Sequence, residues 1–66
     1  MSITATTTDI NVALHRELLR LARAEDDKAA NDAATVPYWS PCPPSVHGHR
    51  TAAAILRAEA DLLDAC

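Results

Sequence analysis

The sequence predicts an all-α protein, an antiparallel helical hairpin, and three observations support this prediction. Residues 9–34 and 45–65 each carry apolar side chains at the spacing of an amphipathic helix. The connecting segment 35–45 holds all four prolines, which exclude a helix there. The chain has only 66 residues, so it forms a single domain, and two long helices with a short connection pack antiparallel.

Residues 1–8 are rich in Thr and show no helical period, so we expect a flexible N-terminal tail ahead of a domain at 9–66. The tail lacks the basic region and apolar core of a secretory leader. No run in the chain approaches the ~20 apolar residues of a membrane span. We therefore expect a cytoplasmic protein with no membrane contact, and its two cysteines as free thiols.

The first helix is expected at residues 9–34, with Thr8 or Asp9 as its N-cap. No Gly or Pro interrupts it, and its apolar stripe covers roughly 120° of arc. The stripe consists of Ile10, Leu14, Leu18, Leu21, Ala22 and Ala29. Beyond residue 22 only alanines remain apolar in it, so the second half relies on helix propensity or packs closely through Ala.

The second helix is expected at residues 45–65, capped by Ser45. Because Gly48 weakens the first turn, Thr51 is the other candidate start. Its apolar arc covers nearly half of the helix and consists of Ala52, Ala53, Ile55, Leu56, Ala60, Leu62 and Leu63. The opposite face is charged, with Arg57 and Asp61 at i, i+4 spacing.

The apolar inventory is too small for a stable isolated monomer. Alanine supplies 14 of the 66 residues, whereas Leu, Ile and Val together supply 13 and Phe is absent. A chain of this size needs a partner or a staple to fold. We therefore expect a homodimer that forms a four-helix bundle. Its expected interface residues are Leu19, Ile55, Glu59 and Leu62. Glu59 is expected either at the rim of the interface or paired, and an arginine of the first helix across the dimer is a candidate partner.

The proline-rich connection carries both aromatic residues of the chain, Tyr38 and Trp39. They either fold back and close the end of the bundle or form a contact surface. Trp and Tyr are favoured at protein interfaces, and prolines lower the entropy that a loop loses on binding. As partner-binding residues the sequence therefore predicts Tyr38, Trp39 and Pro41.

A row of three arginines, Arg16, Arg20 and Arg23, lies within roughly 60° on the first helix. We predict that these arginines also contact the protein partner, as polar contacts ranked after those of the loop residues. Duplicated across a dimer, the row suggests a nucleic-acid-binding regulator as an alternative. Against nucleic acid stand the net charge of −3, the nearby Glu17 and Asp27, and the absence of a helix-turn-helix pattern.

A second alternative is a metal-binding module built from Cys42, His47 and His49. The spacing matches no standard zinc pattern, and there is no C-x-x-C pair. On a helix the two histidines point about 200° apart and cannot share an ion. We therefore expect no metal and no cofactor.

Taken together, these patterns predict a small accessory or regulatory protein that binds a larger protein and performs no catalysis. A chain this short cannot enclose the several hundred Å³ of an ordinary enzyme pocket. The composition, rich in Ala, Arg and Asp and poor in Lys, is typical of a high-GC bacterium or one of its phages.

Overall fold

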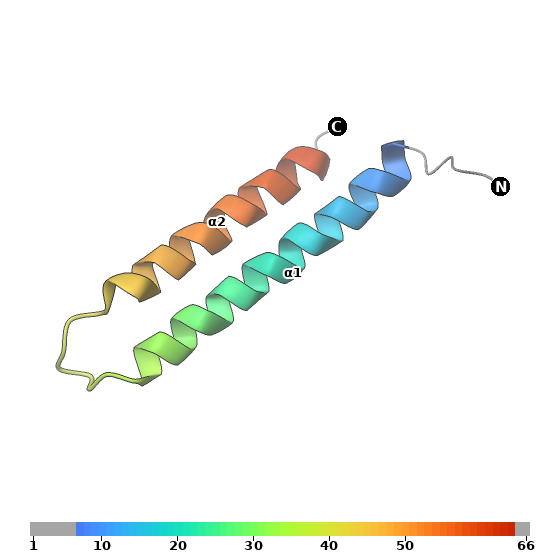
Figure 1. Cartoon of the computed structure of the whole chain (residues 1–66). Helices are drawn as coiled ribbons and strands as arrows, with labels where there is room; N and C mark the ends of the chain where they lie inside the picture. The colour runs from blue at the N-terminus through green and yellow to red at the C-terminus, as the bar shows by residue number, and fades with distance from the viewer. Residues whose placement is uncertain (1–6, 65–66) are drawn as a thin grey trace.

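The structure, a computed structural model, describes residues 7–64 and contains two helices in this range and no strand. Helix α1 spans Thr7–Ala34 and helix α2 spans Pro44–Asp64, and they run antiparallel as a hairpin (Figure 1). The all-α helical hairpin is thereby confirmed. The Cα atoms extend over 58 × 24 × 12 Å, so the molecule is a single layer of two helices. Neither of these helices has the length and apolarity to cross a membrane.

Helix α1 begins two residues earlier than the sequence predicts, at Thr7. Thr8 and Asp9 therefore lie in its first turn, and the prediction that one of them is the N-cap is wrong. Asp9 still complements the positive end of the helix dipole from this position. Of the predicted flexible tail, residues 1–6 lie outside the described residues, and Thr7 and Thr8 are helical.

Helix α2 begins at Pro44, so Ser45 is its second residue and neither Ser45 nor Thr51 starts it. Proline suits the first helical position because its ring presets φ and its missing N–H would be unpaired there. The backbone N–H of Val46 donates to the carbonyl of Pro43 at 3.0 Å, which closes the first turn. The predicted end at residue 65 lies one residue beyond the described range.

The contact between the helices is built from small side chains at every seventh position. The fully buried residues are Ala22 and Ala29 on α1 and Val46, Ala53 and Ala60 on α2. A seven-residue spacing keeps one line of each helix facing its neighbour, as in a coiled coil. Alanine in this line allows close approach of the two backbones, and this line, which we call the alanine seam, is the whole buried core of the described residues.

The leucine stripe predicted on α1 therefore faces α2 only in part. Ala22 and Ala29 are buried and Leu18 is half-buried, but Ile10, Leu14 and Leu21 are exposed. The physical reason is that the seam follows the alanines, which lie at one edge of the stripe. The larger side chains at its other edge point away from α2.

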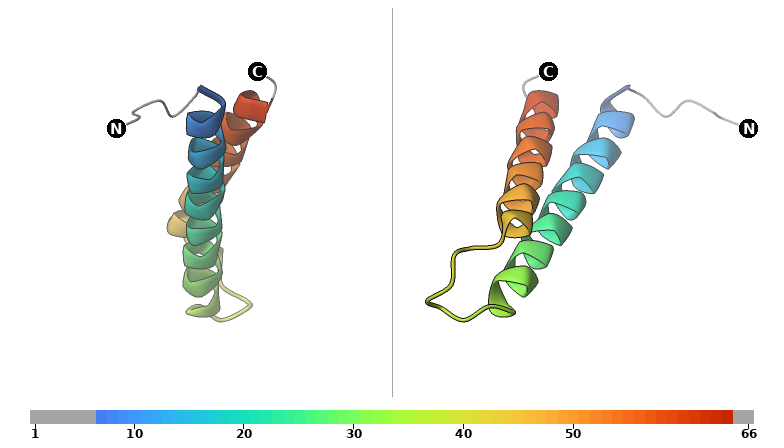
Figure 2. Two further views of the ribbon diagram at one scale, coloured as in Figure 1. Left: turned by 90° about the vertical axis from the view of Figure 1, so that its right-hand side faces the viewer. Right: turned by 60° about the vertical axis from the view of Figure 1, so that its left-hand side comes forward.

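Polar contacts of Arg57, His15 and His49 cross between the helices and fix how the helices lie against each other. Arg57 donates to the Asp26 carboxylate, His15 Nε2 lies 3.1 Å from Asp64 Oδ2, and His49 pairs with Glu25. Arg57 thus bonds across the hairpin, whereas the sequence suggested its own-helix neighbour Asp61. The pairs are spread along the hairpin, from the loop end to the end where α1 begins and α2 finishes (Figure 2).

Candidate interaction surfaces

The loop between the helices presents its aromatic residues at the tip of a turn. The N–H of Ser40 donates to the Pro37 carbonyl at 3.0 Å, so Tyr38 and Trp39 occupy the two central positions of this turn. At the end of α1, the Thr35 hydroxyl donates to the Asp32 carbonyl at 2.7 Å and satisfies one of the last carbonyls of the helix. The turn is therefore anchored close to the helix that precedes it.

Both aromatic side chains are exposed: Tyr38 is 95% and Trp39 is 72% accessible. They contact each other edge to face, with ring centroids 5.1 Å apart and an interplanar angle of 84°. The alternative in which they fold back and close the end of the bundle is therefore not what this hairpin shows. Pro41 is exposed beside them, and the prolines limit the conformations of the segment that returns to α2.

The three arginines of the predicted row line a shallow groove on α1 of about 480 Å³. Its other lining residues are Val12, His15 and Leu19, so the groove combines aliphatic and cationic side chains. The structure thus brings Arg16, Arg20 and Arg23 together as predicted. Leu19, which the sequence analysis assigned to the oligomer interface, lines this groove on α1. The other residues predicted for that interface, Ile55, Glu59 and Leu62, lie on α2.

The charges of the row are unequal. Arg20 donates from Nε to Glu17 at 3.0 and 3.1 Å and also from Nη2, and this contact holds the pKa of Glu17 below its ordinary value. The same contact raises the pKa of Arg20. Arg16 and Arg23 have no ion pair among the described residues. The uncompensated positive charge of the groove therefore comes from Arg16 and Arg23.

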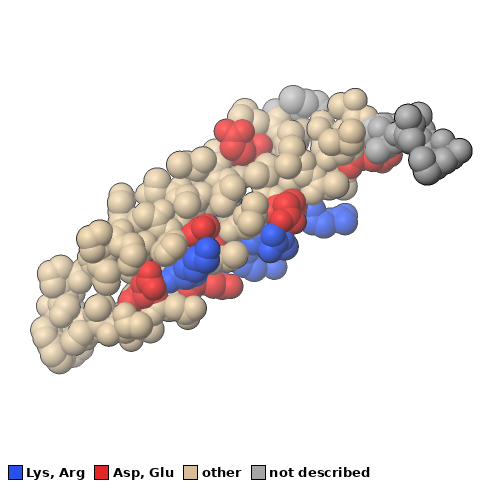
Figure 3. Space-filling view, in the orientation of Figure 1, with Lys and Arg blue, Asp and Glu red and all other residues tan. Residues whose placement is uncertain are grey.

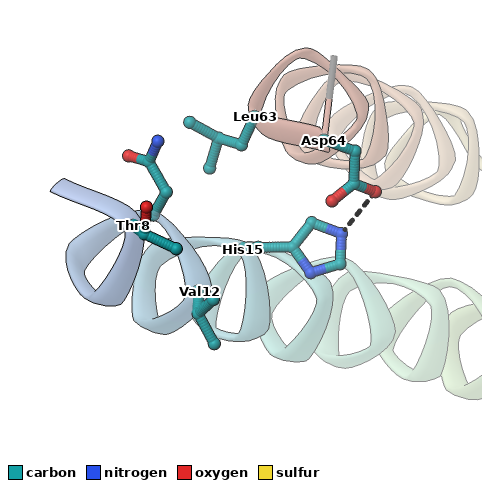
Figure 4. Close-up of a pocket in the computed structure, with 6 residues that line it drawn as sticks. Thr8, Val12, His15, Leu63 and Asp64 are labelled. Atoms are coloured by element: carbon teal, nitrogen blue, oxygen red, sulfur yellow. Dashed lines mark ion pairs between the residues drawn. The ribbon is translucent and has the colours of Figure 1, made fainter. Parts of the chain in front are cut away.

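A second groove, of about 250 Å³, opens between the two helices at the end away from the loop. Figure 4 shows His15 of α1 turned toward Asp64 of α2, with Leu63 pointing into the space between the helices. Thr8, Asn11 and Val12 complete the lining. The contact that the structure shows for this His–Asp pair is a link between the two helices.

The metal candidates Cys42, His47 and His49 are not brought together. Because α2 begins at Pro44, both histidines are helical and diverge, and Cys42 is a free, exposed thiol in the loop. His49 instead contacts Glu25 through Nδ1 at 2.5 Å and lies 3.5 Å from Asp32 through Nε2. Within residues 7–64 no group of three His, Cys, Asp or Glu side chains has an arrangement that could hold a metal ion.

The cross-helix role of the histidines was missed by the sequence analysis. The available signal was the seven-residue spacing of the alanine seam, because it places Glu25, Asp32 and His49 beside the seam. The contact with His49 also shifts the pKa of Glu25. Its hydrogen bond, together with Lys28, holds the pKa of Glu25 below the ordinary value.

The residues of the predicted oligomer interface are exposed in the single hairpin. Ile55 and Leu62 are 58% and 59% accessible, and Glu59 lies between them on the same helix. Seven large aliphatic side chains of α1 and α2 are exposed: Ile10, Val12, Leu14, Leu19, Leu21, Ile55 and Leu62. Most of the large aliphatic side chains on the two helices are thus still in contact with water.

Comparisons with models of protein families, with curated proteins and with solved structures found no match to this chain.

Proposed function

We propose that this chain is a small accessory or regulatory protein that acts by binding a larger protein and catalyses no reaction. The observation that carries the proposal is the exposed Tyr38–Trp39 pair at the tip of the turn. Large aromatic side chains cost free energy when exposed to water and supply much of the binding energy of protein interfaces. A short turn between prolines holds them ready, which lowers the entropy lost on binding.

The hairpin has the shape of a rod with an uncharged tip. From Ala33 to Val46 the chain carries no acidic or basic side chain, whereas the helices are rich in both. An uncharged aromatic tip fits an apolar pocket on the partner. The groove of Arg16 and Arg23 would then supply polar contacts along the side of the rod, to an acidic segment of the partner.

Self-association is part of this proposal. The alanine seam buries little apolar surface, and a second hairpin would cover the aliphatic side chains left exposed, giving a homodimeric four-helix bundle. The loops stay outside such a bundle because they extend beyond the helix ends.

The test is quantitative capture of the partner by immobilised protein, followed by a dissociation constant with the purified partner. Trp39→Ala is expected to weaken binding by tenfold or more, as for a residue at the centre of an interface. Ser45→Ala, on the exposed first turn of α2, is the matched control and should bind like the parent protein. If Trp39→Ala binds normally, or loses helical content by circular dichroism, the aromatic tip is not the contact surface.

A nucleic-acid regulator is the second candidate, because Arg16 and Arg23 lack ion-pair partners within residues 7–64. Binding to duplex DNA that persists at physiological salt and disappears in Arg23→Glu would favour it over the protein partner.

A further inference from the structure

The groove on α1 that holds the three arginines, which we call the arginine groove, has the pattern of a surface on which a helix docks. Four of its lining residues follow one another along the chain at spacings of four, three and four residues: Val12, Arg16, Leu19 and Arg23. This spacing keeps side chains in one line along a helix, and a second helix packs along such a line. Because the line alternates aliphatic and cationic side chains, the element that covers it must offer both apolar contacts and negative charge.

The hairpin leaves the positive charge of the arginine groove only partly compensated. Glu17 accepts hydrogen bonds from Arg20 within α1, and Asp26 accepts one from Arg57 of α2. Asp27 and the other two arginines of the groove form no ion pair within residues 7–64. In Figure 3 most of the basic side chains gather along α1, with acidic side chains among them. Two guanidinium groups are therefore left without a counter-charge beside exposed aliphatic carbon.

The distance between these two guanidinium groups favours a helix as the occupant. Arg16 and Arg23 are seven residues apart on α1, which is about 10 Å along the helix axis. A partner helix repeats the same interval every seven residues, so two of its carboxylates face both arginines at once. In an extended strand the side chains of one face recur about every 6.7 Å, and none of them matches this interval. The phosphates of a nucleic-acid duplex supply negative charge but no apolar contact for Val12 and Leu19.

From the alternating line and its uncompensated charge we infer that the arginine groove binds an acidic amphipathic helix of the protein partner. That helix carries Asp or Glu opposite Arg16 and Arg23, and aliphatic side chains opposite Val12 and Leu19. The inference rests on the proposed function, because it names the element of the partner that lies along the side of the rod. It assigns Leu19 to the contact with this helix.

The probe is a synthetic, dye-labelled helical peptide in which Glu and Leu alternate along one line at these spacings and the other positions are Ala and Gln. Its binding to the full chain is measured by fluorescence anisotropy. Because the chain has a net charge of −3, it repels an acidic peptide overall, so binding reports a local site. We expect binding at low salt that weakens as the salt concentration rises. A parent chain that does not bind the peptide even at low salt would overturn the inference.

A second peptide tests whether the line along the helix is recognised. It has the same composition, but its Glu residues are spread around the helix, and it should bind about two- to fivefold more weakly. Equal binding of the two peptides would show that the groove does not select a helix with aligned carboxylates.

The charge contacts are tested by removing one arginine at a time. Arg16→Gln and Arg23→Gln should each weaken binding of the first peptide about two- to fivefold, the range of one exposed ion pair. Arg50→Gln is the matched control, because it removes an exposed charge of α2 that lies outside the groove and has no ion pair among the described residues. An equal loss in Arg50→Gln would show a general attraction between charges and would overturn the groove as the site.

The apolar contacts are tested by Leu19→Gln, which should weaken binding about two- to tenfold. Leu14→Gln is the matched control, since Leu14 is also exposed on α1 but is rotated about 140° from Leu19 and does not line the groove. Circular dichroism checks that both variants keep their helical content. Equal losses in the two variants would overturn the groove. If Leu19→Gln instead converts a dimer to single chains on a sizing column, a second copy of the chain occupies the groove and not a partner helix.

Two further arms separate this inference from the proposed function. Trp39→Ala should bind the peptide like the parent chain, because the loop lies beyond the helix ends. A chain that loses its protein partner in Trp39→Ala but does not bind the peptide would keep the aromatic contact and lose the groove. Duplex DNA that displaces the peptide at physiological salt would assign the groove to nucleic acid and overturn the inference.

Discussion

His49 of α2 donates a hydrogen bond from Nδ1 to the Glu25 carboxylate of α1 at 2.5 Å, joining the helices toward the loop end. The contact lies beside the alanine seam, with both side chains shielded over most of their surface. Among the described residues it is one of four polar contacts between two helices that share little apolar surface. Such contacts therefore carry a larger share of the hairpin's stability than they would in a protein with a large core.

Acid should loosen the hairpin through Glu25. The hydrogen bond from His49 lowers the pKa of Glu25 below its ordinary value of 4.5. A carboxyl whose pKa is lowered on folding stabilises the folded state above its unfolded pKa, and this contribution is lost as the pH falls through the folded pKa. We expect the urea concentration at the midpoint of unfolding to decrease as the pH drops below about 4.5. In Glu25→Gln this decrease should be less steep.

The control for this pH effect is Glu17→Gln. The pKa of Glu17 is also lowered, by Arg20, but that pair lies within α1 and does not join the helices. If Glu17→Gln weakens the pH dependence of the urea midpoint as much as Glu25→Gln does, the cross-helix contact has no special role in the loss of stability in acid.

Replacing Gly48 with alanine should stabilise the protein. Gly48 is helical without a positive φ, and an added Cβ would meet no atom within 4 Å. Alanine in a helix interior is favoured over glycine by roughly 0.5–1 kcal/mol. The gain is measured by thermal unfolding, where 1 kcal/mol corresponds to about 4–8 °C for a chain of this size. The reverse change at an exposed position of α2, Ala54→Gly, should cost a similar amount.

The alanine seam should not accept a larger side chain. Ala53 is fully buried against α1, whereas its neighbour Ala54 is exposed. Ala53→Leu should therefore destabilise the hairpin by about 1–3 kcal/mol, because the backbones must separate to admit the extra volume. Ala54→Leu is the matched control and should change stability little, since Leu and Ala have similar helix propensity. Equal urea midpoints for the two variants would show that the helices do not pack through the alanines.

The fluorescence of the single tryptophan should report an exposed side chain in the folded protein. Trp39 is 72% accessible and contacts the ring of Tyr38. Its emission maximum and its quenching by acrylamide should therefore resemble those of the urea-unfolded chain. Dimerisation through the exposed aliphatic side chains of the helices leaves the loop free and should not change them. If the emission maximum of Trp39 instead shifts markedly to the blue when the protein self-associates, and returns on dilution, the loop lies inside the dimer.

The amphipathic periods and the clustered prolines were enough to predict two helices, their antiparallel arrangement and the position of the loop. These features follow from local rules, since the four prolines exclude a helix between residues 37 and 44 whatever the rest of the chain does. The three arginines share a groove for the same reason, because their spacing along one helix sets their direction. What one helix does alone was predictable from its own residues.

The tertiary structure decided which edge of each apolar stripe faces the other helix. Leucines and alanines share one arc on α1, and the sequence alone favours burial of the larger side chains. The helices instead meet along Ala22 and Ala29, opposite Ala53 and Ala60, because small side chains allow the backbones to approach most closely. That choice left Leu14 and Leu21 exposed and turned His49 toward Glu25. The pairing of residues on different helices depends on rotation and register between them, which no local period of the sequence specifies.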